Sequence, residues 1–187
     1  MRHMLESPWR AATLGLVLTL GVIALPLAYQ LDATSAFAVV IRALHLLGAM
    51  VWAGLIVFVN FVQLQALKAV SDTERPLIVR HIAGPTARLF TGAAHATLAT
   101  GVLMLVPIGA AVHQRIVLLL AVAGGLAMWA IVQFILRPNV ARITGKVAAS
   151  DAEKAAARVA IATWARINLV LVIPVSVAML VAAHAGL

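Results

Sequence analysis

One apolar stretch of this sequence, residues 36–62, together with the residue that follows it, carries a set of polar and aromatic side chains that could do chemistry together. They are Arg42, His45, Trp52, Asn60 and Gln63. At about 100° per residue, these positions fall on one helical stripe roughly 80° wide. Imidazole is a common metal ligand, and a guanidinium pairs well with a carboxylate. Polar groups that face lipid are costly, so the stripe is expected to face the interior of a helical bundle.

Two interpretations of this stripe are open. In one, its side chains form hydrogen-bonding contacts between helices, which are common in membrane bundles. In the other, His45 ligates a haem iron and Arg42 lies near a haem propionate. Trp52 is on the same face and would line such a site.

Two further histidines, His95 and His184, could supply a second axial ligand. His95 lies one turn after Thr91, and His184 lies near the C-terminal end of the last apolar stretch. A bis-imidazole haem needs two histidines at similar depth on facing helices. At about 1.5 Å per residue, His45–His184 and His45–His95 are each offset by several ångströms, so both pairs stay open. We favour His45 with His184, because both lie in the outer half of the membrane near Arg42.

The composition places these residues in a membrane protein. Of the 187 residues, 64% are hydrophobic and 11% are charged, whereas soluble domains are about half apolar and about a quarter charged. The lipid bilayer must therefore be part of the solvent. The sequence has no Cys, which excludes disulfides, zinc–thiolate sites and covalent c-type haem attachment within it. We expect a single all-α domain over residues 1–187.

A helix needs about 20 mostly apolar residues to cross the hydrocarbon core, and this length predicts about five transmembrane helices. The predicted spans are residues 11–30, 36–62, 89–108, 115–136 and 167–186. With the N-terminus in the cytoplasm, only Arg42 and Arg115 of the 14 Lys and Arg lie on the outer side. This bias predicts an N-terminus inside and a C-terminus outside. It also accounts for the net charge of +8 without a nucleic-acid partner.

The segments between the spans are predicted to be short or polar. They comprise a link around Asp32–Ser35, a loop from Gln63 to Arg88, a tight turn at Pro107–Gln114 and a segment from Arg137 to Arg166. In the last segment, Ser150 and Glu153 have the spacing of a capping box, and an Ala-rich run follows them. We expect one helix to begin near Asp151, to run along the cytoplasmic face and to enter the bilayer near Arg166.

Ordered blocks of residues resemble one known family. Arg42-Ala43-Leu44-His45, Trp52-Ala53-Gly54 and Asn60-Phe61-Val62-Gln63 are similar to the early span of the membrane domain of bacterial urate hydroxylase, the cytochrome c-type urate oxidase. Later blocks of this sequence resemble the second half of the same domain, so that the resemblance covers residues 36–187. They are Arg137-Pro138-Asn139, Arg166-Ile167-Asn168, Ile173-Pro174 and His184. The span from His45 to Gly54 alone is also similar to copper-resistance membrane proteins and to a haem-containing protoporphyrinogen oxidase.

The resemblance implies a multi-pass protein of the bacterial inner membrane that binds haem b and takes part in redox or electron-transfer chemistry. The family's proteins are longer and carry a C-terminal cytochrome c domain. Because this sequence has no Cys for a c-type haem, a separate cytochrome is the expected electron acceptor. Urate as the substrate is not implied by the fold alone.

The main alternative is a cofactor-free structural or accessory subunit that packs on a protein partner in a larger membrane complex. Small residues within the spans would allow such close helix contacts. They are Gly15, Gly21, Gly48, Gly92, Gly101, Gly124 and Gly125. A transporter is disfavoured, because the predicted spans lack the acidic side chains that ion-coupled carriers use.

Overall fold

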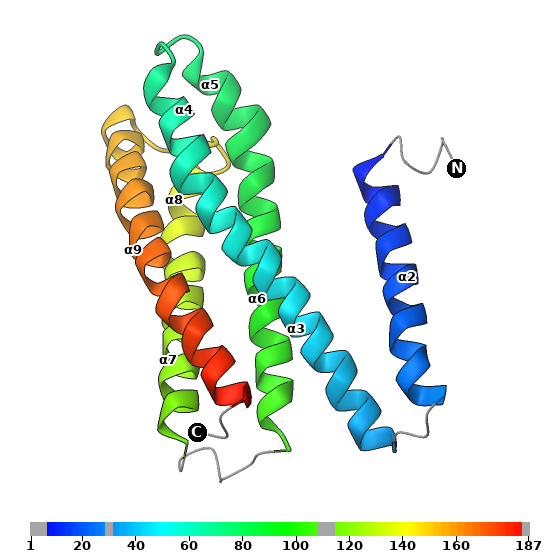
Figure 1. The fold of residues 1–187 in the computed structure, drawn as a ribbon. Coiled ribbons are helices and arrows are strands. Elements are labelled where there is room, and N and C mark those ends of the chain that lie inside the picture. The colour runs from blue at the N-terminus through cyan, green and yellow to red at the C-terminus, as the bar shows by residue number, and fades with distance from the viewer. Residues whose placement is uncertain (1–6, 29–31, 108–114, 185–187) are drawn as a thin grey trace. The chain divides into compact units, whose positions relative to one another are not determined.

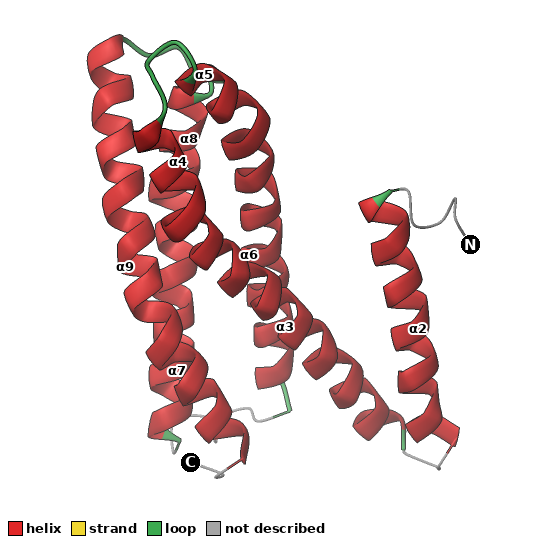
Figure 2. Cartoon of the chain, turned by 45° about the horizontal axis from the view of Figure 1, so that its top comes forward, coloured by secondary structure: helices red, strands yellow, loops and turns green. Residues whose placement is uncertain are grey.

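The computed structural model describes residues 7–28, 32–107 and 115–184, and these residues form helices and no strands (Figure 1 and Figure 2). The predicted all-α class is therefore confirmed. By its internal contacts the chain divides into two compact units, Met1–Ala43 and Leu44–Leu187.

The first unit contains α2 (Pro8–Ala28) and the beginning of α3 (Ala33–Phe58). Asp32 caps α3, because its carboxylate accepts hydrogen bonds from the backbone N–H groups of Thr34 and Ser35 at 2.9 and 3.0 Å. These N–H groups have no partner within the helix, so the cap fixes where α3 begins. The predicted link around Asp32–Ser35 is thus a helix cap.

The described part of the second unit consists of four helical rods, three of which contain a π-helical turn. The first rod joins the rest of α3 to η1 (Val59–Gln63) and α4 (Leu64–Ala69). The second joins α5 (Arg75–Ile78), η2 (Val79–Ala83) and α6 (Gly84–Leu105). The third joins α7 (Ile116–Ala130), η4 (Ile131–Leu136) and α8 (Arg137–Ile143). The fourth is a single helix, α9 (Asp151–His184), which runs beside α8 and α7.

The four rods pack around one apolar core, to which each contributes buried side chains. The core includes Trp52 and Ile56 of α3, Phe90 of α6, Met128 of α7 and Ile161 of α9. Ile56 is only 1% exposed. In water, burying each such side chain would stabilise the fold by roughly 1.5–3 kcal/mol through the hydrophobic effect. In lipid, close van der Waals packing between helices takes over part of this stabilisation.

Three of the described helices are long and apolar enough to cross a membrane: Thr34–Ala69, Ile116–Ile143 and Asp151–His184. Each of them also exposes large apolar side chains, as contact with lipid requires. On α9, for example, the exposed side chains at helical spacing are Val170, Ile173, Val177 and Leu180. These three helices are therefore consistent with membrane association. The number of five spans and their orientation stay predictions.

Two segments predicted as polar connections are largely helical. The predicted loop from Gln63 to Arg88 contains α4, α5 and η2, so that only residues 70–74 connect the first two rods. In the segment from Arg137 to Arg166, α8 and the first half of α9 leave only residues 144–150 as the connection. The predicted turn at Pro107–Gln114 lies almost wholly outside the described residues.

The capping box at the start of α9 is confirmed. The backbone N–H of Ser150 donates to the Glu153 carboxylate at 2.7 Å, and the backbone N–H of Glu153 donates to the Ser150 hydroxyl at 3.3 Å. α9 then continues without a break to His184, with Pro174 inside it.

A partial box with the same Ser–Glu spacing holds the turn between α4 and α5, because the Glu74 N–H bonds to the Ser71 carbonyl and not to its hydroxyl. Glu74 accepts hydrogen bonds from the hydroxyl of Ser71 at 2.6 Å and from its backbone N–H at 3.1 Å. Arg75 anchors the turn to α4 by donating from Nε to the carbonyl of Leu67 at 3.2 Å. The polar residues of this segment therefore hold a tight turn, and the helices on both sides extend far into the segment.

This turn is expected to loosen in acid. The hydrogen bonds from Ser71 lower the pKa of the Glu74 carboxyl. The turn is therefore stabilised at pH values above the ordinary glutamate pKa of about 4.3, and this contribution is lost as the pH falls through the lowered folded-state value. Hydrogen-exchange protection of the Ser71 amide, corrected for intrinsic exchange rates, should fall over this range. Glu74→Gln should remove the pH dependence, and a Gln variant that keeps the wild-type profile would contradict the assignment.

Candidate functional site

The stripe predicted on residues 36–62 is mostly interior. Trp52, Asn60 and Gln63 are 6%, 7% and 7% exposed, and His45 is half-buried. Arg42 is exposed but belongs to the first unit, so its expected position beside the other four side chains stays a prediction. A cation on an apolar helix is costly to bury without a counter-charge, and the neighbouring turns of α3 provide none.

The imidazole of His45 is held against α6. Its Nδ1 lies 3.0 Å from the carbonyl oxygen of Thr97 and 3.1 Å from the hydroxyl oxygen of Thr100. A carbonyl oxygen only accepts, so Nδ1 carries a proton and donates it. In the neutral ring, Nε2 then has a free lone pair, and it has no hydrogen-bond partner in the described part of the chain.

Two glycines let α3 and α6 approach closely at this histidine. A Cβ added at Gly101 would lie 3.1 Å from Cε1 of His45, and one added at Gly48 would lie 2.9 Å from Oγ1 of Thr97. The ring therefore packs edge-on against the backbone of α6. Its orientation is fixed by both packing and hydrogen bonding.

The other two candidate histidines have separate surroundings. His95 is exposed, donates from Nδ1 to the carbonyl of Thr91 at 2.7 Å, and meets the ring of Trp129 edge-on at 5.9 Å between centroids. On an ideal helix it lies roughly 160° around α6 from Thr97, the partner of His45. His95 and the α6 residues that contact His45 therefore lie on different faces of α6.

His184 lies at the C-terminal end of α9, where it is exposed and donates from Nδ1 to the carbonyl of Leu180 at 2.9 Å. His45 and His184 thus share no partner residue. Within the described residues, no group of three or more His, Cys, Asp or Glu could hold a metal ion.

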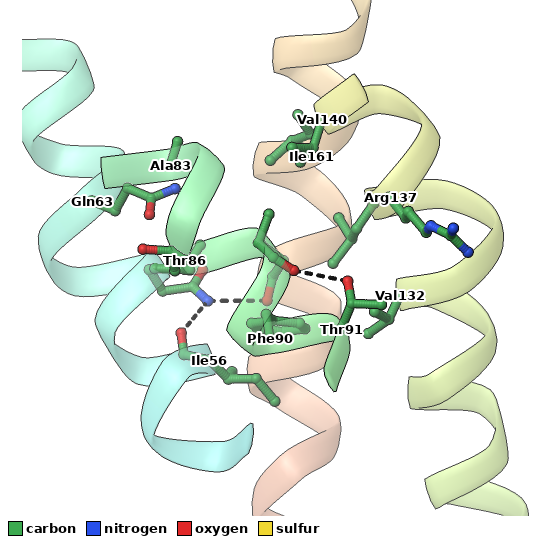
Figure 3. Close-up of a pocket in the computed structure, with 15 residues that line it drawn as sticks. Ile56, Gln63, Ala83, Thr86, Phe90, Thr91, Val132, Arg137, Val140 and Ile161 are labelled. Carbon is green, nitrogen blue, oxygen red and sulfur yellow. Dashed lines mark hydrogen bonds between the residues drawn. The ribbon is translucent and has the colours of Figure 1, made fainter. Parts of the chain in front are cut away.

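A cavity of about 50 Å³ lies between the four rods (Figure 3). We call it the chamber. Its polar wall is formed by Asn60, Gln63, Thr86 and Thr91, with apolar side chains around them. No histidine lines the cavity, and its volume is far too small for a haem.

The three π-helical turns found among the described residues all line the chamber. η1 contributes Asn60 and Gln63, η2 contributes Ala83, and η4 contributes Val132 and Leu136. Two of these turns precede a proline, Pro85 in α6 and Pro138 in α8. Proline lacks an N–H and clashes with the carbonyl four residues before it, so a wider turn relieves the clash.

No proline follows η1 within α4. There, the hydrogen bonds of the Asn60 side chain account for the wide turn instead. Its Nδ2 donates to the carbonyl of Ile56, one turn earlier, at 2.8 Å and to the carbonyl of Ala165 in α9 at 3.1 Å (Figure 3). Asn60 therefore ties the first rod to the fourth at the edge of the chamber.

Sequence reasoning identified Asn60 and Gln63 as interior but did not find the chamber they form. Thr86, Phe90 and Ala165 complete it from two other rods. The available signals were Pro85 and Pro138, which mark the positions of two wide turns.

Residues of two of the blocks that carry the resemblance line the chamber, and a third block begins one residue after Ala165. Asn60, Gln63 and Arg137 line the chamber, and Asn168 lies one turn after Ala165 on α9. Asn168 is fully buried, and neither its Nδ2 nor its Oδ1 has a hydrogen-bond partner. No protein-family model matches this chain, and searches of curated proteins and of solved structures find no match.

Proposed function

We propose that this chain is a membrane-embedded, haem b-linked redox or electron-transfer subunit in which His45 is an axial ligand through Nε2. The observation that carries the proposal is the hydrogen bond from Nδ1 of His45 to the carbonyl of Thr97. Histidines that ligate metals usually donate their other ring N–H to a carbonyl or a carboxylate, which fixes the tautomer and orients the ring. The resemblance of residues 36–187 to the urate hydroxylase membrane domain supports the same function.

The donor chemistry at His45 fits a haem. A bound haem b would supply one-electron exchange between ferric and ferrous iron. The chain's own residues would fix the ring: Thr97 and Thr100 hold Nδ1, and Gly101 keeps Cε1 packed against α6. His184 also donates from Nδ1 to a carbonyl and so presents Nε2 for the second axial position, whereas His95 lies on another face of α6.

Haem titration of the purified protein tests this proposal. Haemin added to the wild-type protein is expected to give a shifted Soret band that saturates at a fixed stoichiometry. His45→Ala should weaken binding at least about tenfold, since it removes a ligand whose outer-shell partners alone affect affinity by 10–100-fold in known sites. His184→Ala should also weaken binding, whereas His95→Ala should titrate like the wild type.

His81 provides the matched control, because it is exposed and lies in η2, away from α3. His81→Ala should titrate like the wild type. If His45→Ala binds haem as tightly as His81→Ala, His45 is not the ligand and the proposal fails.

A cofactor-free accessory subunit is the second candidate. It is favoured by the same contact, because the bond between His45 and Thr97 also ties α3 to α6 where Gly48 permits a close approach. In that case the purified protein should bind no haem, His45→Ala should lower stability alone, and a stoichiometric membrane partner should copurify.

A further inference from the structure

The chamber contains polar atoms that the protein itself does not satisfy. Oδ1 of Asn60 and Oε1 of Gln63 are buried and have no hydrogen-bond partner. Both residues are more than nine-tenths buried and line the cavity. Buried polar atoms in folded proteins almost always have a partner, which is often ordered water. The chamber therefore offers hydrogen-bond acceptors to a ligand that donates.

The orientation of the Asn60 amide is not ambiguous. Its nitrogen lies between two carbonyl oxygens, those of Ile56 and Ala165. Exchanging the amide nitrogen and oxygen would place three acceptors together without a proton between them. Oδ1 is therefore the atom left without a partner, and it can only accept.

The charge around the chamber excludes an ionic ligand of either sign. Arg137 is part of the wall, but its guanidinium points away from the cavity and donates to Oε1 of Gln133 at 3.2 Å (Figure 3). No acidic residue lines the cavity. An anion would meet the Asn60 oxygen without a compensating cation, and a cation would lack a carboxylate. A neutral donor fits best.

We propose that the chamber is an internal hydration site in which ordered water donates to Oδ1 of Asn60 and bonds to Gln63 and Thr86. A volume of about 50 Å³ accommodates roughly three to five water molecules, since each needs about 10–15 Å³ by this measure. The three π-helical turns create the volume, because a wide turn pushes the helix backbone away from its neighbours. This site is separate from His45 and does not depend on haem binding.

Hydroxyl-radical footprinting of the full chain in detergent micelles tests the proposal. Radicals produced from water by a brief X-ray pulse oxidise side chains that contact water, including water inside a protein. Phe90 lines the chamber and is 6% exposed, whereas Met128 is 2% exposed in the same core and does not line it. Methionine is intrinsically the more reactive of the two. We nevertheless expect Phe90 to be oxidised several times faster than Met128.

A variant that fills the chamber provides the second arm. Ala87→Leu adds three carbon atoms at a wall position of the cavity and should reduce the oxidation of Phe90 to the level of Met128, with the helical circular dichroism unchanged. Two results would overturn the proposal: oxidation of Phe90 no faster than that of Met128 in the wild type, or a Phe90 rate that Ala87→Leu leaves unchanged.

Discussion

Gly124→Ala is expected to destabilise the bundle by about 1–3 kcal/mol, although Ala is the better helix former by about 1 kcal/mol. A Cβ at Gly124 would collide with Cγ2 of Val175 in α9. Valine has one strongly preferred rotamer in a helix, so its methyl cannot turn away without strain. α7 and α9 would have to separate along their shared contact.

The adjacent glycine is the matched control for this prediction. A Cβ at Gly125 would lie 3.9 Å from the terminal methyl of Met179, an ordinary van der Waals distance. Gly125→Ala should therefore be neutral or stabilise the protein by up to about 1 kcal/mol through helix propensity. The free energies of unfolding would be compared in mixed detergent micelles. Equal effects of the two substitutions would show that α7 and α9 do not pack as described.

Asn60→Leu and Asn168→Leu are expected to change stability in opposite directions. Asn60→Leu removes two hydrogen bonds, one of which joins the first rod to α9. At about 0.5–1 kcal/mol for each bond, the expected loss is about 1–2 kcal/mol. Asn168 makes no hydrogen bond from its side chain and is completely buried. Replacing such a group with an apolar one of similar size should stabilise the protein by about 1–2 kcal/mol.

The same unfolding measurement decides this pair, with each Leu variant compared with the wild type. A loss of stability in Asn168→Leu would mean that a ligand or water satisfies Asn168, so that the chamber extends farther along α9. A gain would support the opposite interpretation, that the unsatisfied amide of Asn168 is retained for a function at a cost in stability.

The apolar lengths in the sequence predicted the helices well but not their ends. Hydropathy falls where charged residues begin, so the predicted spans stop near Gln63 and Leu136. The helices continue for another turn or two because local caps support them. The box of Ser71 and Glu74 has the same spacing as that of Ser150 and Glu153, so its signal was present in the sequence.

Helical periodicity correctly predicted that Trp52, Asn60 and Gln63 are interior. It could not predict the exposure of Arg42, because an ideal helix gives the relative direction of side chains and not the width of the contact with neighbouring helices. The π-helical turn in η1 also changes the phase after residue 58, which a constant angle per residue ignores.

The choice between histidine pairs could not be made from depth. Depth depends only on the position along a helix, whereas a shared ligand also requires the correct rotation about each axis. His95 and His45 fail this rotational condition, because the contacts of His45 are on another face of α6. The sequence also could not tell which glycines lie at close helix contacts. Gly48, Gly101 and Gly124 do, whereas a Cβ added at Gly92 would have no neighbouring atom within 4 Å.

The most direct measurement is one absorbance spectrum of the purified protein from a haem-supplied membrane preparation, recorded oxidised and then reduced with dithionite. If His45 is an axial haem ligand, the spectrum should show a Soret band that shifts on reduction, with sharpened bands in the visible region, and His45→Ala should abolish both. A protein that is colourless in both states, while folded and helical by circular dichroism, would contradict the haem assignment and leave His45 as a contact between α3 and α6.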